Sequence, residues 1–153
     1  MNTVVDQVLN IVQKYHITTF PSAYTLRRIA LEEGLILGDF PFRGRIKEVF
    51  IRTSDGIALL TLKSGLPESE LKHAFAHGLG HFFFHKDPGI YILGILRTGL
   101  EAQAEDFAAL LLVPPASLKE SGQEIPAQEI ARLAQIPYRL ACRRIALARR
   151  YGV

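Results

Sequence analysis

Four of the five histidines in the chain recur at every fourth position, as His73-Ala-Phe-Ala-His77-Gly-Leu-Gly-His81-Phe-Phe-Phe-His85. Four residues make slightly more than one turn of an α-helix, so on a helix these imidazoles line one stripe. The stripe drifts by about 40° per step, so only neighbouring rings can share one point. Two histidines at positions i and i+4 of a helix can grip one tetrahedral zinc ion. We select His77 and His81 as this pair.

The residue after His77 is unusual for such a site. Metalloproteases with the pattern His-Glu-x-x-His carry a glutamate there, which takes a proton from the metal-bound water. This chain has Gly78 instead, so the sequence predicts a metal site more directly than it predicts hydrolysis. Glycine inside a helix costs about 1 kcal/mol relative to alanine. Gly78 and Gly80 therefore indicate a packing requirement for at least one of them, and we expect Gly80 to let another backbone approach the helix.

Length and composition indicate one globular domain over residues 1–153. The chain has 153 residues and is 48% hydrophobic, which allows a real core and excludes intrinsic disorder. No apolar run reaches the roughly 18 residues of a membrane helix, and the first residues lack the plan of a signal peptide. A single cysteine, Cys142, excludes an internal disulfide framework. We expect a cytoplasmic protein with no membrane partner.

Charge is distributed unevenly along the chain. The net charge is +3, and every charged side chain after Glu129 is an arginine. A solvated helix face explains this basic end, and an acidic partner surface or nucleic acid is the alternative. Two close helices near the end also allow a helix-turn-helix interpretation, but Leu133, Leu140 and Leu147 are more simply explained as core contacts. Direct binding of nucleic acid is therefore not expected.

The order of the predicted elements indicates an α+β fold with a small, mostly antiparallel sheet covered by helices on one face. Periodicity and breakers predict helices at 3–15, from Pro21-Ser22 to Glu33-Gly34, and from Pro67 to about His85. Strands are predicted at 35–37, 46–51 and 57–62, the last two joined by a turn at 53–56. The segment 90–96 fits a strand, a loop over the site or a helix. Residues 126–153 form a helical C-terminal part, with helices at 127–134 and 137–151 after a polar link.

A further helix, Glu101 to Val113, carries the candidate third ligand. Zinc held by two histidines needs at least one more protein ligand, often a carboxylate. Glu101 is the residue we choose, and Ala104 and Ala108 on the same face allow close helix approach. Glu105 lies one turn further on, where it would orient a histidine through its second ring nitrogen or replace Glu101 as ligand.

The remaining residues of the motif have other expected roles. His73 and His85 lie one turn before and one turn after the pair, where they would contact substrate or the groups around the ligands. The three phenylalanines after His81 are interpreted as core packing. One zinc ion per chain is expected, although manganese or iron also suits two histidines and one carboxylate. The alternative is that the histidines are core or surface residues that bind no metal.

These residues resemble the ImmA/IrrE metallopeptidases, gluzincin-like proteins of bacteria and phages. The resemblance covers roughly residues 20–150 and rests on two segments, Ala76-His-Gly-Leu-Gly-His-Phe-Phe-Phe-His85 and Glu101-Ala-Gln-Ala-Glu-Asp-Phe-Ala-Ala-Leu-Leu-Leu-Val-Pro114. The corresponding family patterns are Ala-His-Glu-x-Gly-His-x-x-x-His and Glu-x-x-Ala-Asn-x-Phe-Ala followed by Leu-Leu-Met-Pro. Ile136-Pro137-Tyr138 and the arginine-rich helix after it are also similar to the family's C-terminal part.

The resemblance implies a zincin-like active-site helix and zinc on His77, His81 and Glu101. It also implies a cytoplasmic endopeptidase that cuts a helix-turn-helix repressor and so relieves repression of a mobile element or stress regulon. Gly78 departs from the family's general base, Glu105 from its usual Asn or Asp, and Val113 from its usual Met. Two hypotheses follow. The first is a zinc-dependent peptidase in which another group, Glu70, Glu105 or His73, transfers the proton. The second is a metal-binding relative that binds a regulatory protein without cutting it.

Overall fold

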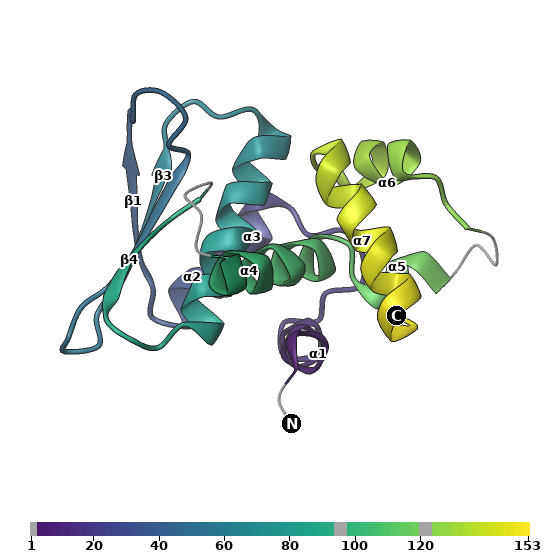
Figure 1. The fold of residues 1–153 in the computed structure, drawn as a ribbon, viewed down its shortest axis with the longest axis horizontal. Helices are drawn as coiled ribbons and strands as arrows, with labels where there is room; N and C mark the ends of the chain where they lie inside the picture. Colours follow the sequence, from purple (N-terminus) through teal and green to yellow (C-terminus); the bar gives the residue numbers. More distant parts are fainter. Residues whose placement is uncertain (1–2, 94–97, 120–123) are drawn as a thin grey trace.

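The computed structural model describes residues 3–93, 98–119 and 124–153 and confirms the α+β fold (Figure 1). In these ranges the elements follow the order α1 (Val4–Lys14), α2 (Ala23–Glu32), β1 (Ile36–Phe40), β2 (Glu48–Arg52), β3 (Ala58–Lys63), α3 (Glu68–Phe84), β4 (Gly89–Ile92), α4 (Thr98–Leu112), α5 (Pro115–Lys119), α6 (Ala127–Ala134) and α7 (Tyr138–Tyr151). None of the helices in these ranges has both the length and the apolar character needed to cross a bilayer.

The sheet has four strands in the order β1-β3-β2-β4 and is mostly antiparallel, as predicted. β2 pairs antiparallel with both β3 and β4, whereas β1 pairs parallel with β3. The predicted turn between β2 and β3 is present: the Thr53 amide donates to Ile57 and the Gly56 amide donates to Thr53. Gly56 has a φ of +88°, a value that favours glycine.

One face of the sheet is buried against helices, and α3 packs on β2 and β3. Alternate residues of a strand point to the same face, and the buried ones are Glu48 and Phe50 in β2 and Ala58, Leu60 and Leu62 in β3. Four of these five are apolar. The exception, Glu48, is fully buried beneath α3.

α3 and α4 are in close contact at a glycine. A Cβ atom on Gly80 would lie only 2.9 Å from the Cα of Ala104, so no larger residue fits without moving the α4 backbone. The expectation that Gly80 admits a neighbouring backbone is confirmed. This contact sets the acidic first turns of α4 beside the histidines of α3.

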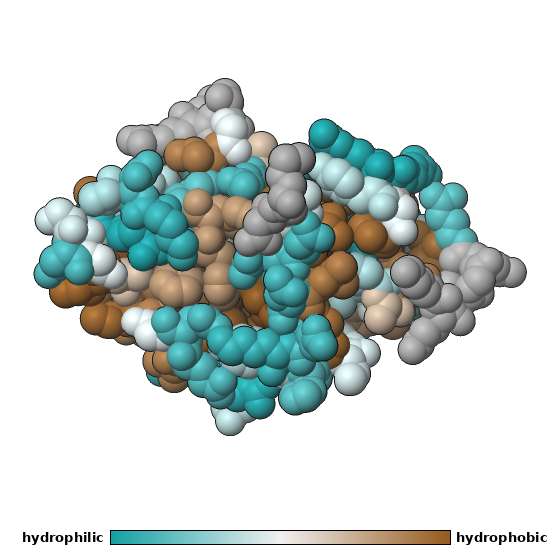
Figure 2. Space-filling model, turned by 90° about the horizontal axis from the view of Figure 1, so that it is seen from below, coloured by the Kyte–Doolittle hydropathy of each residue, from teal (hydrophilic) through white to brown (hydrophobic). Residues whose placement is uncertain are grey.

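The other helices hold α3 and α4 in place. α1 packs against α4, and Figure 2, the view from below, shows hydrophilic residues on the outer surface of α1. α7 packs against both α4 and α6, and the buried Lys72 of α3 donates a hydrogen bond to the main-chain oxygen of Ala134 at the end of α6. The C-terminal helices therefore contact both helices that carry the candidate site.

Several element boundaries differ from those predicted. The first strand extends past Gly38 to Phe40, and the second begins at Glu48 rather than at 46. In the ambiguous segment the structure shows a strand at Gly89–Ile92, while residues 94–97 lie outside the described ranges. α4 begins at Thr98, three residues before Glu101. The segment after Pro114 was expected to be a polar link, but it opens with α5, because proline is well suited to the first helical position.

Candidate metal centre

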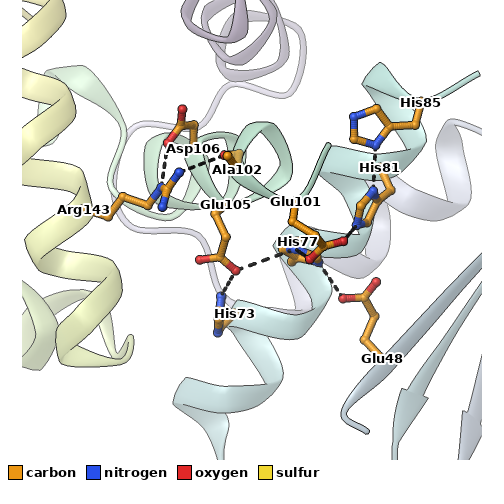
Figure 3. Close-up of polar contacts among 10 residues, drawn as sticks. All are labelled: Glu48, His73, His77, His81, His85, Glu101, Ala102, Glu105, Asp106 and Arg143. Carbon is orange, nitrogen blue, oxygen red and sulfur yellow. Dashed lines mark hydrogen bonds and ion pairs between the residues drawn. The ribbon is translucent and has the colours of Figure 1, made fainter. Parts of the chain in front are cut away.

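His73, His77 and His81 of α3 and His85, which caps its C-terminus, are all buried and follow one another along one side of the helix (Figure 3). His77 and His81 are completely buried, and their ring centroids lie 4.7 Å apart. Stacking of Phe50 on the His81 ring and contact with Tyr91 fix the position of that ring. The adjacent pair selected from the sequence therefore forms a rigid two-imidazole unit.

Glu101 projects from α4 between these two rings. One of its carboxylate oxygens lies 3.0 Å from Nε2 of His77 and the other lies 3.0 Å from Nε2 of His81. Ligand atoms bound at 2.0–2.2 Å to a tetrahedral zinc ion stand about 3.3–3.5 Å apart. Each of the two distances is close to that range, so the carboxylate of Glu101 bridges the two predicted histidines.

A carboxylate from the sheet holds the other nitrogen of His77. Oε2 of the buried Glu48 lies 2.9 Å from Nδ1 of His77 and accepts its proton in a hydrogen bond. This contact makes Nδ1 the donor, so Nε2 is the nitrogen at which a cation would take the place of a proton. Glu48 was missed by the sequence interpretation.

The His81 ring is fixed by a chain of hydrogen bonds that starts at Gln103. The side-chain oxygen of Gln103 can only accept, so Nε2 of His85, 3.0 Å away, is the donor. Nδ1 of His85 then accepts from Nδ1 of His81 at 2.7 Å. Burial lowers the pKa of His85, in agreement with a neutral ring. Nε2 of His81 is therefore left with an available lone pair.

The two Nε2 atoms have no hydrogen bond of acceptable geometry to any residue that the structure describes, although both are buried. Buried polar atoms are nearly always hydrogen-bonded, and exceptions require an explanation. Four such atoms occur among the described residues: these two, Oε1 of Glu48 and Nη2 of Arg144. The two Nε2 atoms face the same carboxylate, and a bound cation would satisfy them together. The donor set, two imidazoles and one carboxylate, suits zinc.

A buried group of three residues, Glu48, His77 and His81, could hold a metal ion. One ligand atom each from Glu48, His77 and His81 lies within 4.8 Å of the others. However, the Glu48 oxygen is at the Nδ1 side of His77, away from the Nε2 atoms that Glu101 faces. Since one imidazole nitrogen binds the metal while the other contacts an outer partner, we assign Glu48 to the outer position.

Glu105 lies one turn after Glu101 and pairs with His73. Its Oε1 accepts a hydrogen bond from Nε2 of His73 at 2.7 Å and lies 3.7 Å from Nε2 of His77. Burial would raise the pKa of Glu105, but the hydrogen bond from His73 together with the charges of His73, His77 and Arg143 lowers it. Of the two roles left open for Glu105, orienting a histidine matches these contacts for His73, and its greater distance from His77 makes it a weaker candidate ligand than Glu101.

The charged groups of the centre shift one another's pKa values. Burial alone would lower the pKa of His77, but the carboxylates of Glu48 and Glu101 raise it to about 10. Burial would likewise raise the pKa of Glu101, but His77 and His81 lower it to about 2. Without a metal, a proton on His77 therefore balances part of the negative charge, and a metal ion would take the place of that proton.

Position 78 is closed to a side chain by the sheet. A Cβ atom there would lie 2.4 Å from Cδ1 of Leu60, which is fully buried in β3. The space next to Gly78 is therefore filled by a hydrocarbon side chain where the metalloprotease pattern has its catalytic glutamate. Gly78 thus has a packing reason of its own, in addition to the one expected for Gly80.

No protein-family model and no curated protein matches the chain.

Proposed function

We propose that this chain is a zinc-binding protein of the ImmA/IrrE type that binds a regulatory protein and does not cut it. The observation that carries the metal assignment is the pair of buried Nε2 atoms, on His77 and His81, that lack hydrogen bonds and face the carboxylate of Glu101. Each is kept available by a partner at the opposite ring nitrogen. Manganese or iron would suit the same ligands, so zinc is the first choice among these.

The absence of a helical glutamate supports binding without cleavage. Bound zinc supplies a Lewis acid and an acidified water, but a positioned general base typically contributes a further 10²–10⁴-fold. Leu60 fills the space beside Gly78, and Glu48 is committed to His77. The partner that the resemblance implies is a helix-turn-helix repressor.

Peptide hydrolysis is the second candidate function, because one carboxylate remains near the open side of the site. Glu105 is about one-fifth exposed and its Oε1 lies 3.7 Å from Nε2 of His77, so it could hold a proton beside the reacting carbonyl. Its lowered pKa makes it a weak base at neutral pH. This feature favours the non-cleaving function.

Metal analysis of protein purified without a histidine tag tests the proposal. We expect one zinc ion per chain, retained by His16→Ala and lost from His77→Ala. His16 is a suitable control because it is exposed and lies after α1, outside the histidine row. Folded wild-type protein that neither contains nor takes up a divalent metal would end the proposal.

A quenched-fluorescent peptide library separates the two candidate functions. We expect no cleavage by the zinc-loaded wild type. Cleavage that is lost in Glu105→Gln at unchanged zinc content would instead establish the peptidase.

A further inference from the structure

A cleft of about 640 Å³ lies beside the candidate metal centre, a volume typical of ligand pockets at ~300–1,000 Å³. Three of its lining residues are cationic and three are aliphatic: Arg45, Lys47, Arg139, Ile46, Ile92 and Leu93. No acidic side chain lines it among the residues that the structure describes.

The position of the cleft follows from the neighbours of its lining residues. Lys47 immediately precedes Glu48, and Ile92 pairs across the sheet with Val49. Arg139 lies one turn before Arg143, whose guanidinium donates to Ala102 and Asp106 in the first turns of α4. Figure 3 shows Arg143 on the α4 side of the centre, close to Glu105. The cleft therefore runs between α7 and the end of the sheet where Glu48 begins β2.

The cations of the cleft are largely available to a ligand. Lys47 contacts Glu70 at 3.2 Å, but Arg45 and Arg139 are exposed and form no ion pair with any described residue. The three aliphatic side chains are only half-buried. An occupant that satisfies both sets of groups carries carboxylates and aliphatic side chains together.

From this arrangement we propose that the cleft binds an acidic peptide segment with aliphatic side chains. Nucleic acid is the less suitable occupant, because single strands are bound on aromatic platforms and the lining described here has none. The inference deepens the proposed function, since it names the chemistry of the partner segment at the same site. Its test is arranged so that it does not depend on zinc.

Fluorescence anisotropy tests the proposal with a labelled nine-residue peptide of alternating Glu and Leu. A Lys-Leu peptide of equal length tests the charge, and a Glu-Ser peptide tests the aliphatic contacts. We expect the Glu-Leu peptide to bind at least about tenfold more tightly than either, with an affinity that falls as salt rises.

The double variant Arg45→Glu/Arg139→Glu should lose about tenfold or more in affinity for the Glu-Leu peptide, because like charges would then face each other. Arg132→Glu/Arg150→Glu is the matched control, with the same change in charge at two exposed arginines outside the cleft. Circular dichroism verifies that both variants fold.

Equal binding of the Glu-Leu and Lys-Leu peptides, or equal losses in the two double variants, would overturn the proposal. The proposal would also be overturned if a 12-nucleotide single strand bound more tightly than the Glu-Leu peptide and only Arg45→Glu/Arg139→Glu lost that binding. The cleft would then be assigned to nucleic acid. Zinc content, measured on the same samples, reports separately on the proposed function: a metal-free protein that still selects the Glu-Leu peptide would remove the zinc assignment alone.

Discussion

Two regions of the molecule bury charge and satisfy it differently. Arg144 of α7 is completely buried; its Nε and Nη1 donate to main-chain oxygens of Val113 at 2.7 Å and Val153 at 3.0 Å, and only its Nη2 has no hydrogen bond to a described residue. The metal centre instead buries side chains whose nitrogens face a shared carboxylate without a hydrogen bond. Main-chain partners make the first region a fixed brace between the end of α4 and α7. Convergent side chains make the second a site that a ligand can complete.

Replacing Arg144 should give the largest effect on folding. Arg144→Leu removes both hydrogen bonds and leaves the buried Val113 oxygen without its donor, which we expect to lower the free energy of unfolding by about 3 kcal/mol. Zinc affinity of the folded variant should stay near that of the wild type, because the brace lies apart from the centre. Urea unfolding and chelator competition measure the two quantities. A loss of zinc affinity larger than the loss of stability would show that the regions are coupled.

The close approach of α3 and α4 should matter for the metal centre. In Gly80→Ala the added Cβ meets the backbone of Ala104 at 2.9 Å, so α4 must shift. We expect a loss of about 2 kcal/mol in the free energy of unfolding and weaker zinc binding, since Glu101 moves with α4.

Gly78→Ala is the matched control for this variant. Its added Cβ meets the end of the Leu60 side chain, which can rotate away, and the higher helix propensity of alanine offsets about 1 kcal/mol of the strain. Equal effects of the two substitutions would contradict the role assigned to helix approach.

Glu48 should affect the centre and not the brace. Glu48→Gln keeps the size of the side chain but removes its charge, and loss of a carboxylate beside a ligand histidine typically costs 10–100-fold in metal affinity. We expect a loss of about tenfold, at the low end of that range, because the amide oxygen can still accept from Nδ1 of His77. Chelator competition measures the change. Unaltered affinity would mean that the contact between Glu48 and His77 serves folding only.

The release of protons when zinc binds should be the smallest of the expected effects. The pKa of His77 is raised to about 10, so at pH 7 the metal-free ring carries a proton that zinc must displace, and about one proton is released per zinc bound. Affinity should therefore fall as pH is lowered from about 10. The stabilising effect of this proton on the metal-free fold has the opposite dependence: it is present below pH 6.5 and is lost as pH rises through about 10. Calorimetry in buffers with different ionisation enthalpies counts the protons, and a count of zero would contradict the raised pKa.

The sequence predicted the part of the centre that depends on helical periodicity. Spacing along the sequence predicts that His77 and His81 lie on one stripe of their helix and that Glu101 and Glu105 share one face of the later helix. The structure places His77, His81 and Glu101 together, whereas their binding of zinc stays a prediction. Sequence patterning also predicted the helices closely, because caps and prolines lie next to their ends.

The parts that were missed depend on how the sheet lies against α3. Glu48 has the same parity as Phe50 in β2, so strand alternation could have indicated that it points inward. A glutamate beside Lys47 instead resembles ordinary surface charge. Leu60 could not have been placed against Gly78, because that contact depends on the docking of β3 under the helix, which no local pattern encodes.

The contact between Leu60 and Gly78 also limits how this lineage could change. A single substitution that restores glutamate at position 78 introduces a buried clash with Leu60, so selection would first meet a less stable protein. Shortening Leu60 beforehand would open a cavity under the histidines at a similar disadvantage. A glutamate at position 78 would therefore call for a second change at position 60, so the two positions are expected to vary together.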